Sequence, residues 1–92
     1  MQTREQKKKV PYIERFNGNI CVHQGEFEKA IKHYSKSLFA LQQIFKSTEN
    51  PIVQTPEEGI KLIKEVEILV CVNLALCYIK TKNYHYALKY AQ

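Results

Sequence analysis

The sequence predicts an all-α fold of four antiparallel helices. Apolar residues recur at helical spacing along most of the 92 residues, and no stretch alternates in the manner of a β-strand. Polar segments that contain turn residues interrupt the helical pattern at 24–26, 47–55 and 81–83. Hydrophobic residues make up 45% of the chain and charged residues 25%, so its composition is that of one small globular domain rather than a disordered segment.

The first helix is expected over about 11–24. Pro11 suits its first turn, where the missing backbone amide is not needed for a helical hydrogen bond. Ile13, Phe16, Ile20 and the neighbouring Cys21 recur at helical spacing and give this helix an apolar stripe. The segment "QGE" then interrupts the pattern and ends the helix.

Residues 1–10 are expected to form a basic N-terminal tail. They hold four basic side chains and one acidic one, a net +3 of the formal +5 of the whole chain. Such a tail suits nucleic acid or an acidic membrane surface, but a solvated, frayed end is the simpler interpretation.

A second and longer helix is expected from Phe27 to about Lys46. Its apolar stripe contains Phe27, Ala30, Ile31, Tyr34, Leu38, Leu41 and Phe45. Asn50 and Pro51 break the pattern, so 47–55 is predicted to be a loop.

The third helix has a clear start signal. Thr55 suits the N-cap, Pro56 the first helical position, and Glu58 the reciprocal partner of a capping box. A continuous helix over 56–80 would contain about 25 residues and measure about 37 Å. Its second half is apolar nearly all round, so we expect it to be buried between neighbouring helices.

The fourth helix follows a short break, "TKN", at 81–83. Asn83 is a plausible cap, and Tyr84, Ala87 and Leu88 begin a new helical pattern that continues to the last residue.

The two helix-turn-helix segments share one pattern. Gly18 precedes the first turn and Ala30 follows it, 12 positions later; Ala75 and Ala87 flank the second turn at the same separation. Small residues let two helices approach closely, and Phe27 and Tyr84 place an aromatic ring beside each turn. The pattern resembles the tetratricopeptide repeat (TPR), which has Leu-Gly-x-x-Tyr before its turn and Ala-x-x-x-Phe after it.

The resemblance to the repeat has departures. Cys21 stands where the pattern expects Tyr, and Ala91 stands at the later aromatic position. Gly18 and Ala75 are 57 positions apart rather than 34, which corresponds to an insertion of 23 residues between the copies. The insertion would lengthen the helices on either side of the loop.

With these lengthened helices and the stretch "VNLALCYIKTKNYHYALKYA", residues 12–92 resemble the TPR domain of the immunophilin (FKBP-type) co-chaperones. The resemblance implies an α-solenoid of about two TPR-type repeats, with repeat one at 11–46, the loop at 47–55 and an incomplete repeat two at 56–92. It also implies a concave groove that binds the acidic C-terminal peptide of a heat-shock chaperone. The isomerase domain of that family has no counterpart here, so no catalytic residue and no cofactor is expected.

Three residues match the carboxylate clamp of that family. The resemblance assigns peptide binding to Arg15, at a place usually held by Lys, and to Asn19 and Asn73, at the two Asn positions. Arg15 and Asn19 are four residues apart and share a helix face, and a cation with amide donors can hold a carboxylate. The two basic ligands that the family takes from a fifth helix have no counterpart before Gln92.

Two alternatives stay open. In the first, Asn19 and Asn73 bond neighbouring backbone groups and Arg15 is a solvated surface cation. In the second, the chain is a structural scaffold subunit or fragment that packs into a large multiprotein assembly by its outer faces rather than its groove.

The remaining residue patterns argue against other functions. No metal site is expected, because the candidate ligands lack metal-ligand spacing: Cys21, His23, His33, Cys71, Cys77 and His85. The tyrosines near the C-terminus could stack on bases, but the repeat assigns Tyr78 to helix packing, and nucleic acid is not the favoured partner. No apolar run is long enough to span a membrane and no signal peptide precedes the first helix, while three cysteines without a framework indicate a reducing compartment. The expected location is cytoplasmic.

A last expectation concerns the apolar faces of the repeats. TPR-type units bury these faces against neighbouring units, and about three are normally needed. The chain ends within its fourth helix, at "ALKYAQ". We therefore expect further repeats or a partner protein to pack on the open side.

Overall fold

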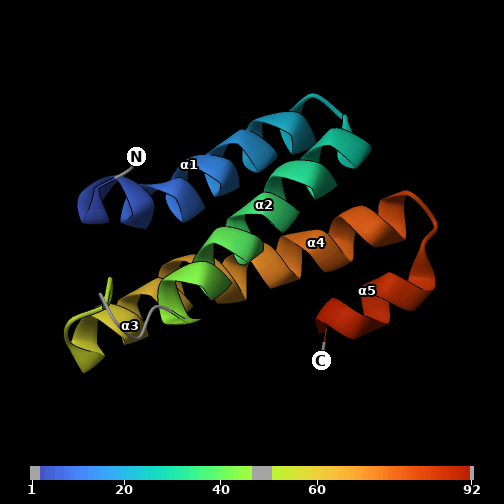
Figure 1. Cartoon of the computed structure of the whole chain (residues 1–92). Helices are drawn as coiled ribbons and strands as arrows, with labels where there is room; N and C mark the ends of the chain where they lie inside the picture. Colours follow the sequence, from blue (N-terminus) through green and yellow to red (C-terminus); the bar gives the residue numbers. More distant parts are fainter. Residues whose placement is uncertain (1–2, 47–50, 92) are drawn as a thin grey trace.

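The computed structural model describes residues 3–46 and 51–91. Within these residues every regular element is a helix (Figure 1). In chain order the elements are α1 (Arg4–His23), α2 (Phe27–Lys46), α3 (Pro56–Leu62), the π-helix η1 (Ile63–Glu67), α4 (Ile68–Lys80) and α5 (Tyr84–Ala91). Because α3, η1 and α4 follow one another without a break, they form one long helix, and the prediction of an all-α fold with four helices is confirmed.

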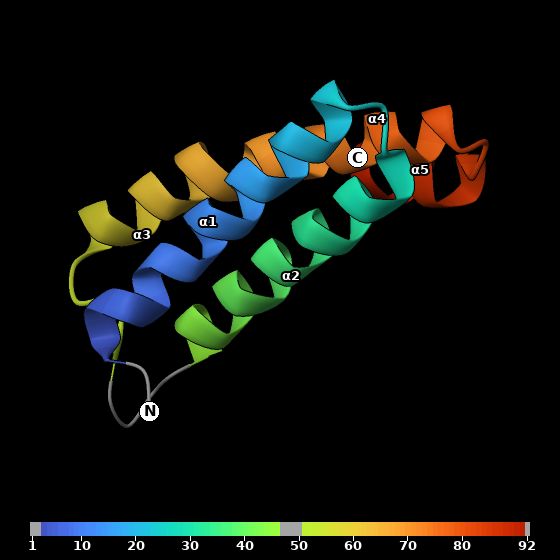
Figure 2. The same ribbon diagram turned by 90° about the horizontal axis from the view of Figure 1, so that it is seen from above.

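The helices are joined at the predicted places. The turns at 24–26 and 81–83 are both non-helical, and residues 51–55 of the predicted loop are non-helical as well, whereas 47–50 lie outside the described residues. Gly25 and Lys82 occupy the middle of the two short turns and both have a positive φ, 75° and 64°. Each turn reverses the chain, so α1 and α2 form one antiparallel pair and α4 and α5 form another (Figures 1 and 2).

The first helix begins earlier than predicted. Thr3 caps α1: its side chain accepts a hydrogen bond from the Gln6 amide, and the Gln6 side chain accepts one from the Thr3 amide. Pro11 therefore lies inside the helix, and residues 4–10 are helical rather than a frayed tail. The carbonyl of the buried Pro11 accepts a hydrogen bond from Ser37 Oγ of α2, at 2.7 Å, which joins the two helices at this point.

The caps of the later helices differ in detail from the prediction. Thr55 does cap α3 by accepting a hydrogen bond from the Glu58 amide. The Glu58 carboxylate, however, accepts from the Gln54 amide, one residue before the predicted partner, at 2.9 Å. Asn83 does not use its side chain as a cap: its amide group donates back to Thr81.

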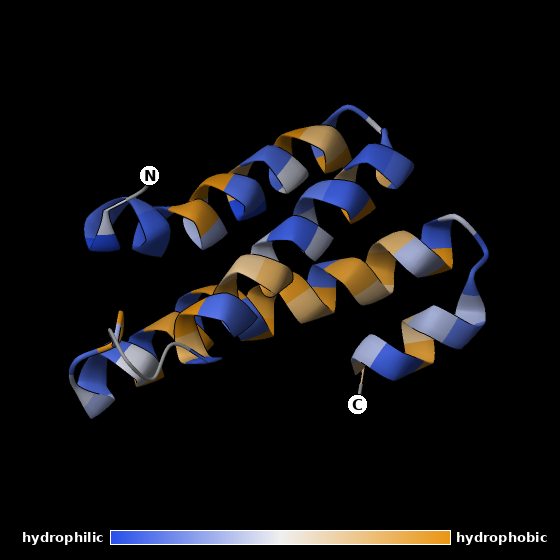
Figure 3. Ribbon diagram, in the orientation of Figure 1, coloured by the Kyte–Doolittle hydropathy of each residue, from blue (hydrophilic) through white to orange (hydrophobic). Residues whose placement is uncertain are grey.

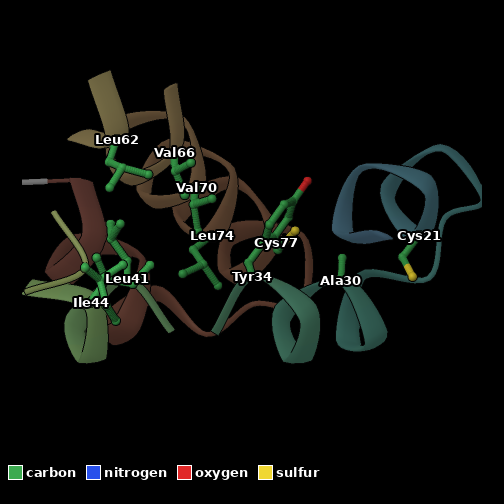
Figure 4. Close-up of a cluster of buried hydrophobic side chains, with 11 residues drawn as sticks. Cys21, Ala30, Tyr34, Leu41, Ile44, Leu62, Val66, Val70, Leu74 and Cys77 are labelled. Atoms are coloured by element: carbon green, nitrogen blue, oxygen red, sulfur yellow. The ribbon is translucent and has the colours of Figure 1, made fainter. Parts of the chain in front are cut away.

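The core lies between α2 and its two neighbours. In Figure 4 the side chains of Val66, Val70 and Leu74 extend from the long helix toward Leu41 and Ile44 of α2. The buried cluster consists of Cys21, Ala30, Tyr34, Leu41, Ile44, Ile52, Leu62, Val66, Val70, Leu74 and Cys77. Burial of these side chains removes apolar surface from water, the main favourable contribution to folding.

Two predicted apolar faces lie mostly outside this core. Cys21 of the predicted α1 stripe is buried, as are Pro11 and Gly18, whereas Ile13, Phe16 and Ile20 of that stripe are exposed. The expectation that the second half of the long helix is buried on all sides is also wrong. Figure 3 shows apolar colour almost all round α4, yet one stripe faces solvent because α2 and α5 cover only the other side; it contains Leu69, Val72, Leu76 and Ile79.

Gly18 sets the distance between α1 and α2. A Cβ atom added at this position would lie 2.5 Å from Cε1 of Tyr34, closer than real Cβ contacts. Gly18 is buried and Tyr34 is 1% exposed, so neither group has free space in which to move. The small residue that the sequence pattern requires before the turn is therefore required by a packed tyrosine ring.

Candidate functional site

The two predicted asparagines meet between α1 and α4. Asn73 Nδ2 donates a hydrogen bond to Asn19 Oδ1 at 3.3 Å, although the residues are 54 positions apart in the chain. The Tyr34 hydroxyl donates to the same oxygen at 2.5 Å. Both bonds are accepted by Oδ1 of Asn19, so they leave its amide nitrogen, the donor atom of the side chain, for a ligand.

The Tyr34 hydroxyl holds this pair of amides in place through its bond to Asn19. Burial raises the pKa of its hydroxyl to about 12, so the group stays protonated and remains a donor at neutral pH. The sequence pattern indicates Tyr34 for packing alone, as a member of an apolar stripe and as the later aromatic residue of the repeat. The signal for its second role is the hydroxyl, because a buried tyrosine normally directs that group to a hydrogen-bond partner.

Arg15 lies one helical turn before Asn19 and contacts the π-helix. Its Nη1 atom donates to the backbone carbonyl of Glu65 at 2.5 Å, and its guanidinium lies 5.8 Å from the ring centre of Tyr12. The Tyr12 hydroxyl donates to Glu65 Oε2 at 2.9 Å. Burial, reinforced by this bond and by the negative charge of Glu65, raises the pKa of Tyr12 to about 12.

These contacts differ from those that the first alternative expected for Arg15, Asn19 and Asn73. Arg15 is not a freely solvated cation, because it bonds a carbonyl in the long helix and its Nε atom is buried without a hydrogen-bond partner among the described residues. Asn19 and Asn73 bond each other and Tyr34, in place of the neighbouring backbone groups that the alternative expected.

The polar contacts of α1 with the long helix follow one stripe. Lys8 forms an ion pair with Glu58, and Tyr12, Arg15 and Asn19 make the bonds described above. The spacings of four, three and four residues place all four side chains on the same side of α1. The long helix therefore contacts α1 through polar groups, whereas its contact with α2 is apolar.

A small pocket adjoins the asparagine pair. Its volume is about 150 Å³, and it is lined by Val22, Phe27, Asn73, Leu76, Cys77 and Lys80. Asn73 thus borders both the hydrogen-bonded pair and an apolar depression that has one cation at its rim. The sequence pattern does not single out Lys80, although its seven-residue separation from Asn73 places both on one helix face.

This arrangement can bind a carboxylate next to an apolar side chain. Asn19 and Asn73 provide amide donors, Arg15 and Lys80 provide positive charge, and the pocket provides an apolar wall. Glu65 opposes an anion from one side, since its carboxylate accepts a bond from Tyr12 and its backbone carbonyl accepts the bond from Arg15. An anionic ligand would therefore have to compete with Glu65 for Arg15.

The described residues give less support to a metal site, a reactive thiol or a membrane-spanning helix. Within residues 3–46 and 51–91 no three His, Cys, Asp or Glu side chains are grouped so that they could hold a metal ion. Burial raises the pKa of both Cys71 and Cys77, which keeps these thiols protonated and poorly nucleophilic. None of the helices in the described part of the chain combines the length and the apolarity needed to cross a membrane.

Comparison of the chain with protein-family models, with curated proteins and with solved structures found no match.

Proposed function

We propose that this chain is a non-catalytic protein-interaction module of the TPR type, which binds the acidic C-terminal peptide of a heat-shock chaperone on the face shared by α1 and α4. The observation that carries the proposal is that Arg15, Asn19 and Asn73 all lie where α1 meets the long helix. These are the three residues that the family resemblance assigns to the clamp, and the fold places them on adjoining helices with a direct bond between the two amides.

The local geometry supports a repeat as well. Gly18 and Ala75 are both buried before their turns, and Ala30 and Ala87 are both buried after them. The two turns have a positive φ at positions that correspond in the two copies, Gly25 and Lys82. The three free cysteines are compatible with a reducing cytoplasm as the location of the module.

In the proposed complex the terminal carboxylate of the peptide accepts hydrogen bonds from the amide groups of Asn19 and Asn73. Arg15 exchanges the Glu65 carbonyl for the carboxylate, a charge-assisted and therefore stronger bond. An apolar side chain of the peptide enters the pocket beside Leu76, and Lys80 meets an acidic residue further along the peptide.

Calorimetric titration with a Glu-Glu-Val-Asp peptide tests this proposal. We expect weak binding that Asn73→Ala lowers by about tenfold, since one amide contact to a charged group contributes about 1.5 kcal/mol. Asn17→Ala is the matched control, because two residues turn a helix by about 200° and place Asn17 on the opposite side of α1 from Arg15 and Asn19. Equal binding by wild type and Asn73→Ala would show that the clamp is not the binding site.

The scaffold function is a second candidate, and the exposed stripe of Ile13, Phe16 and Ile20 favours it. An apolar stripe of this kind is typical of a surface that packs against another protein. If the chain is a scaffold, we expect the folded chain not to bind the acidic peptide. Phe16→Asp should then reduce the size of the complex in which the chain migrates during size-exclusion chromatography of a cell extract, whereas Asn73→Ala should leave that size unchanged.

A further inference from the structure

A second groove runs along the outside of the α1–α2 pair. It consists of two adjoining cavities of about 440 and 570 Å³, which share Val10, Phe39 and Ala40. Phe39 lies in the middle and is 64% exposed, so an aromatic ring forms part of the floor without being covered by this chain. The floor continues to the buried Ile44 and Ile52 at one end.

The groove is separate from the candidate peptide site. Tyr12, Arg15 and Asn19 of α1 contact the long helix, whereas Val10 and Glu14 of the same helix line the groove. Figure 2 shows α1 and α2 side by side along most of their length, so the groove between them follows both helix axes. A ligand can therefore occupy it without touching Asn73.

The dimensions of the groove suit a short helix. Its lining on α2 extends from Ser35 to Lys46, which corresponds to about 17 Å, or three helical turns, at 1.5 Å per residue. An extended peptide would press unpaired backbone amides against an apolar floor, whereas a helix satisfies its own backbone and presents only side chains. The groove between two packed helices can also accommodate the side chains of a third helix.

The charges around the groove select the partner. Lys7, Lys36 and Lys46 line it, and no ion pair among the described residues involves any of the three. The one acidic side chain in the lining, Glu14, is bonded to His33 at 2.7 Å. The rim is therefore positive around an apolar floor.

We propose that this groove binds an amphipathic helix of a partner protein, about three turns long, with an apolar stripe that covers Phe39 and with Asp or Glu on both flanks of that stripe. A second copy of this chain fits less well. The apolar stripe of its own α1, which contains Phe16, follows the lysine-rich start of that helix, and like charges would then meet at the rim. The proposal is independent of the carboxylate clamp.

A pair of synthetic peptides tests this site. Each has about 14 residues, is stapled as a helix, carries one leucine stripe and ends in an amide; the flanking positions are Glu in one peptide and Lys in the other. Fluorescence anisotropy with the full chain is expected to show that the Glu peptide binds at least about tenfold more tightly than the Lys peptide. The double variant Lys7→Glu, Lys36→Glu is expected to reverse this order.

Matched variants locate the binding surface. Phe39→Ala should lower the affinity for the Glu peptide by about tenfold, as expected when an aromatic anchor is removed. Phe16→Ala removes an equally exposed ring, 62%, from another face and should leave the affinity unchanged, as should Asn73→Ala in the clamp. Since Phe39 is exposed, circular dichroism should show the same helix content in Phe39→Ala as in the wild type.

Several results would overturn the proposal. These are no binding of the Glu peptide by the folded chain, equal binding of the two peptides, or an equal loss of affinity in Phe16→Ala and Phe39→Ala. Sedimentation that shows a dimer disrupted by Phe39→Ala would assign the groove to a second copy and would also refute it.

Discussion

Among individual residues, Tyr34 connects the packing of the helices to the candidate site. Its ring fills the space above Gly18, and its hydroxyl holds the oxygen of Asn19. The close approach of α1 to α2 and the orientation of the Asn19 amide therefore depend on the same side chain.

The contact between Gly18 and Tyr34 predicts that one methyl group added at position 18 destabilises the fold. Gly18→Ala should lower the free energy of unfolding by about 1–3 kcal/mol, because the new Cβ would overlap the buried ring and force it to move. Urea unfolding measures the change. Gly59→Ala is the matched control, since its Cβ would meet Val53 at an ordinary 3.5 Å and alanine favours a helix. A Gly18→Ala variant as stable as Gly59→Ala would contradict this packing.

The raised pKa of Tyr34 predicts a loss of stability at alkaline pH. Its hydroxyl ionises near 10 in the unfolded chain and at about 12 in the folded one, so the folded state holds the proton more tightly. The resulting stabilisation is complete below pH 10 and is lost as the pH rises from 10 to 12. Tyr12, whose pKa is also raised to about 12, adds a second contribution of the same sign.

Urea midpoints at pH 8 and pH 11 measure this loss. Tyr34→Phe should reduce the difference between the two midpoints, because the variant has no proton to lose at that position. The Tyr12→Phe, Tyr34→Phe double variant should reduce it further. An unchanged difference in the double variant would show that neither hydroxyl is responsible.

At the scale of the elements, the long helix has two sides with different roles. Leu74 is fully buried against α2, while Leu76, two residues later, is 53% exposed beside the asparagine pair. The π-helix η1 lies earlier in the same helix and brings the carbonyl of Glu65 to Arg15. Such wider turns are often found near functional sites.

The two sides of α4 should respond differently to the same substitution. Leu74→Ala should lower the free energy of unfolding by about 2–5 kcal/mol, the range for a buried leucine that leaves a cavity. Leu76→Ala should change it by less than about 1 kcal/mol, because the side chain is already half in water. Chemical denaturation of both variants provides the comparison, and similar losses would mean that another element covers Leu76.

In the molecule as a whole, α2 is the central helix and contacts α1 on one side and the long helix on the other. The molecule measures 41 × 26 × 18 Å, so it is elongated along its helices. Its α1 contacts the long helix mainly through the stripe of Lys8, Tyr12, Arg15 and Asn19. The candidate peptide site lies at this polar junction.

Loss of Arg15 should loosen this junction without unfolding the core. Arg15→Ala removes a hydrogen bond from a charged donor, which contributes about 1.5–3 kcal/mol when partly buried. We expect faster amide hydrogen exchange in η1 and little change in the buried part of α2. Lys64→Ala, an exposed position in the same π-helix, should leave exchange unchanged. Equal acceleration in α2 and η1 would mean that the junction does not open separately.

The sequence by itself determined the helices and their connections. Helical periodicity, the breaks at 24–26 and 81–83, and the cap at Thr55 are local features, because each depends on residues within one or two turns. The start of α1 is the exception: Pro11 is favoured in a first turn and predicts a later start than the capping box at Thr3 gives. The resemblance to a repeat family also indicates Arg15, Asn19 and Asn73, and the two asparagines are in contact in the folded chain.

Only the tertiary structure decided which apolar face is covered and what each polar side chain bonds. Ile13 and Leu76 have the same helical spacing as buried residues, yet they are exposed because no other helix among the described residues packs on their side. The bond of Arg15 to the Glu65 carbonyl joins residues 50 positions apart and depends on a π-helix that no local pattern signalled. Helical periodicity records how side chains repeat around one helix, whereas burial and pairing depend on where the other helices lie.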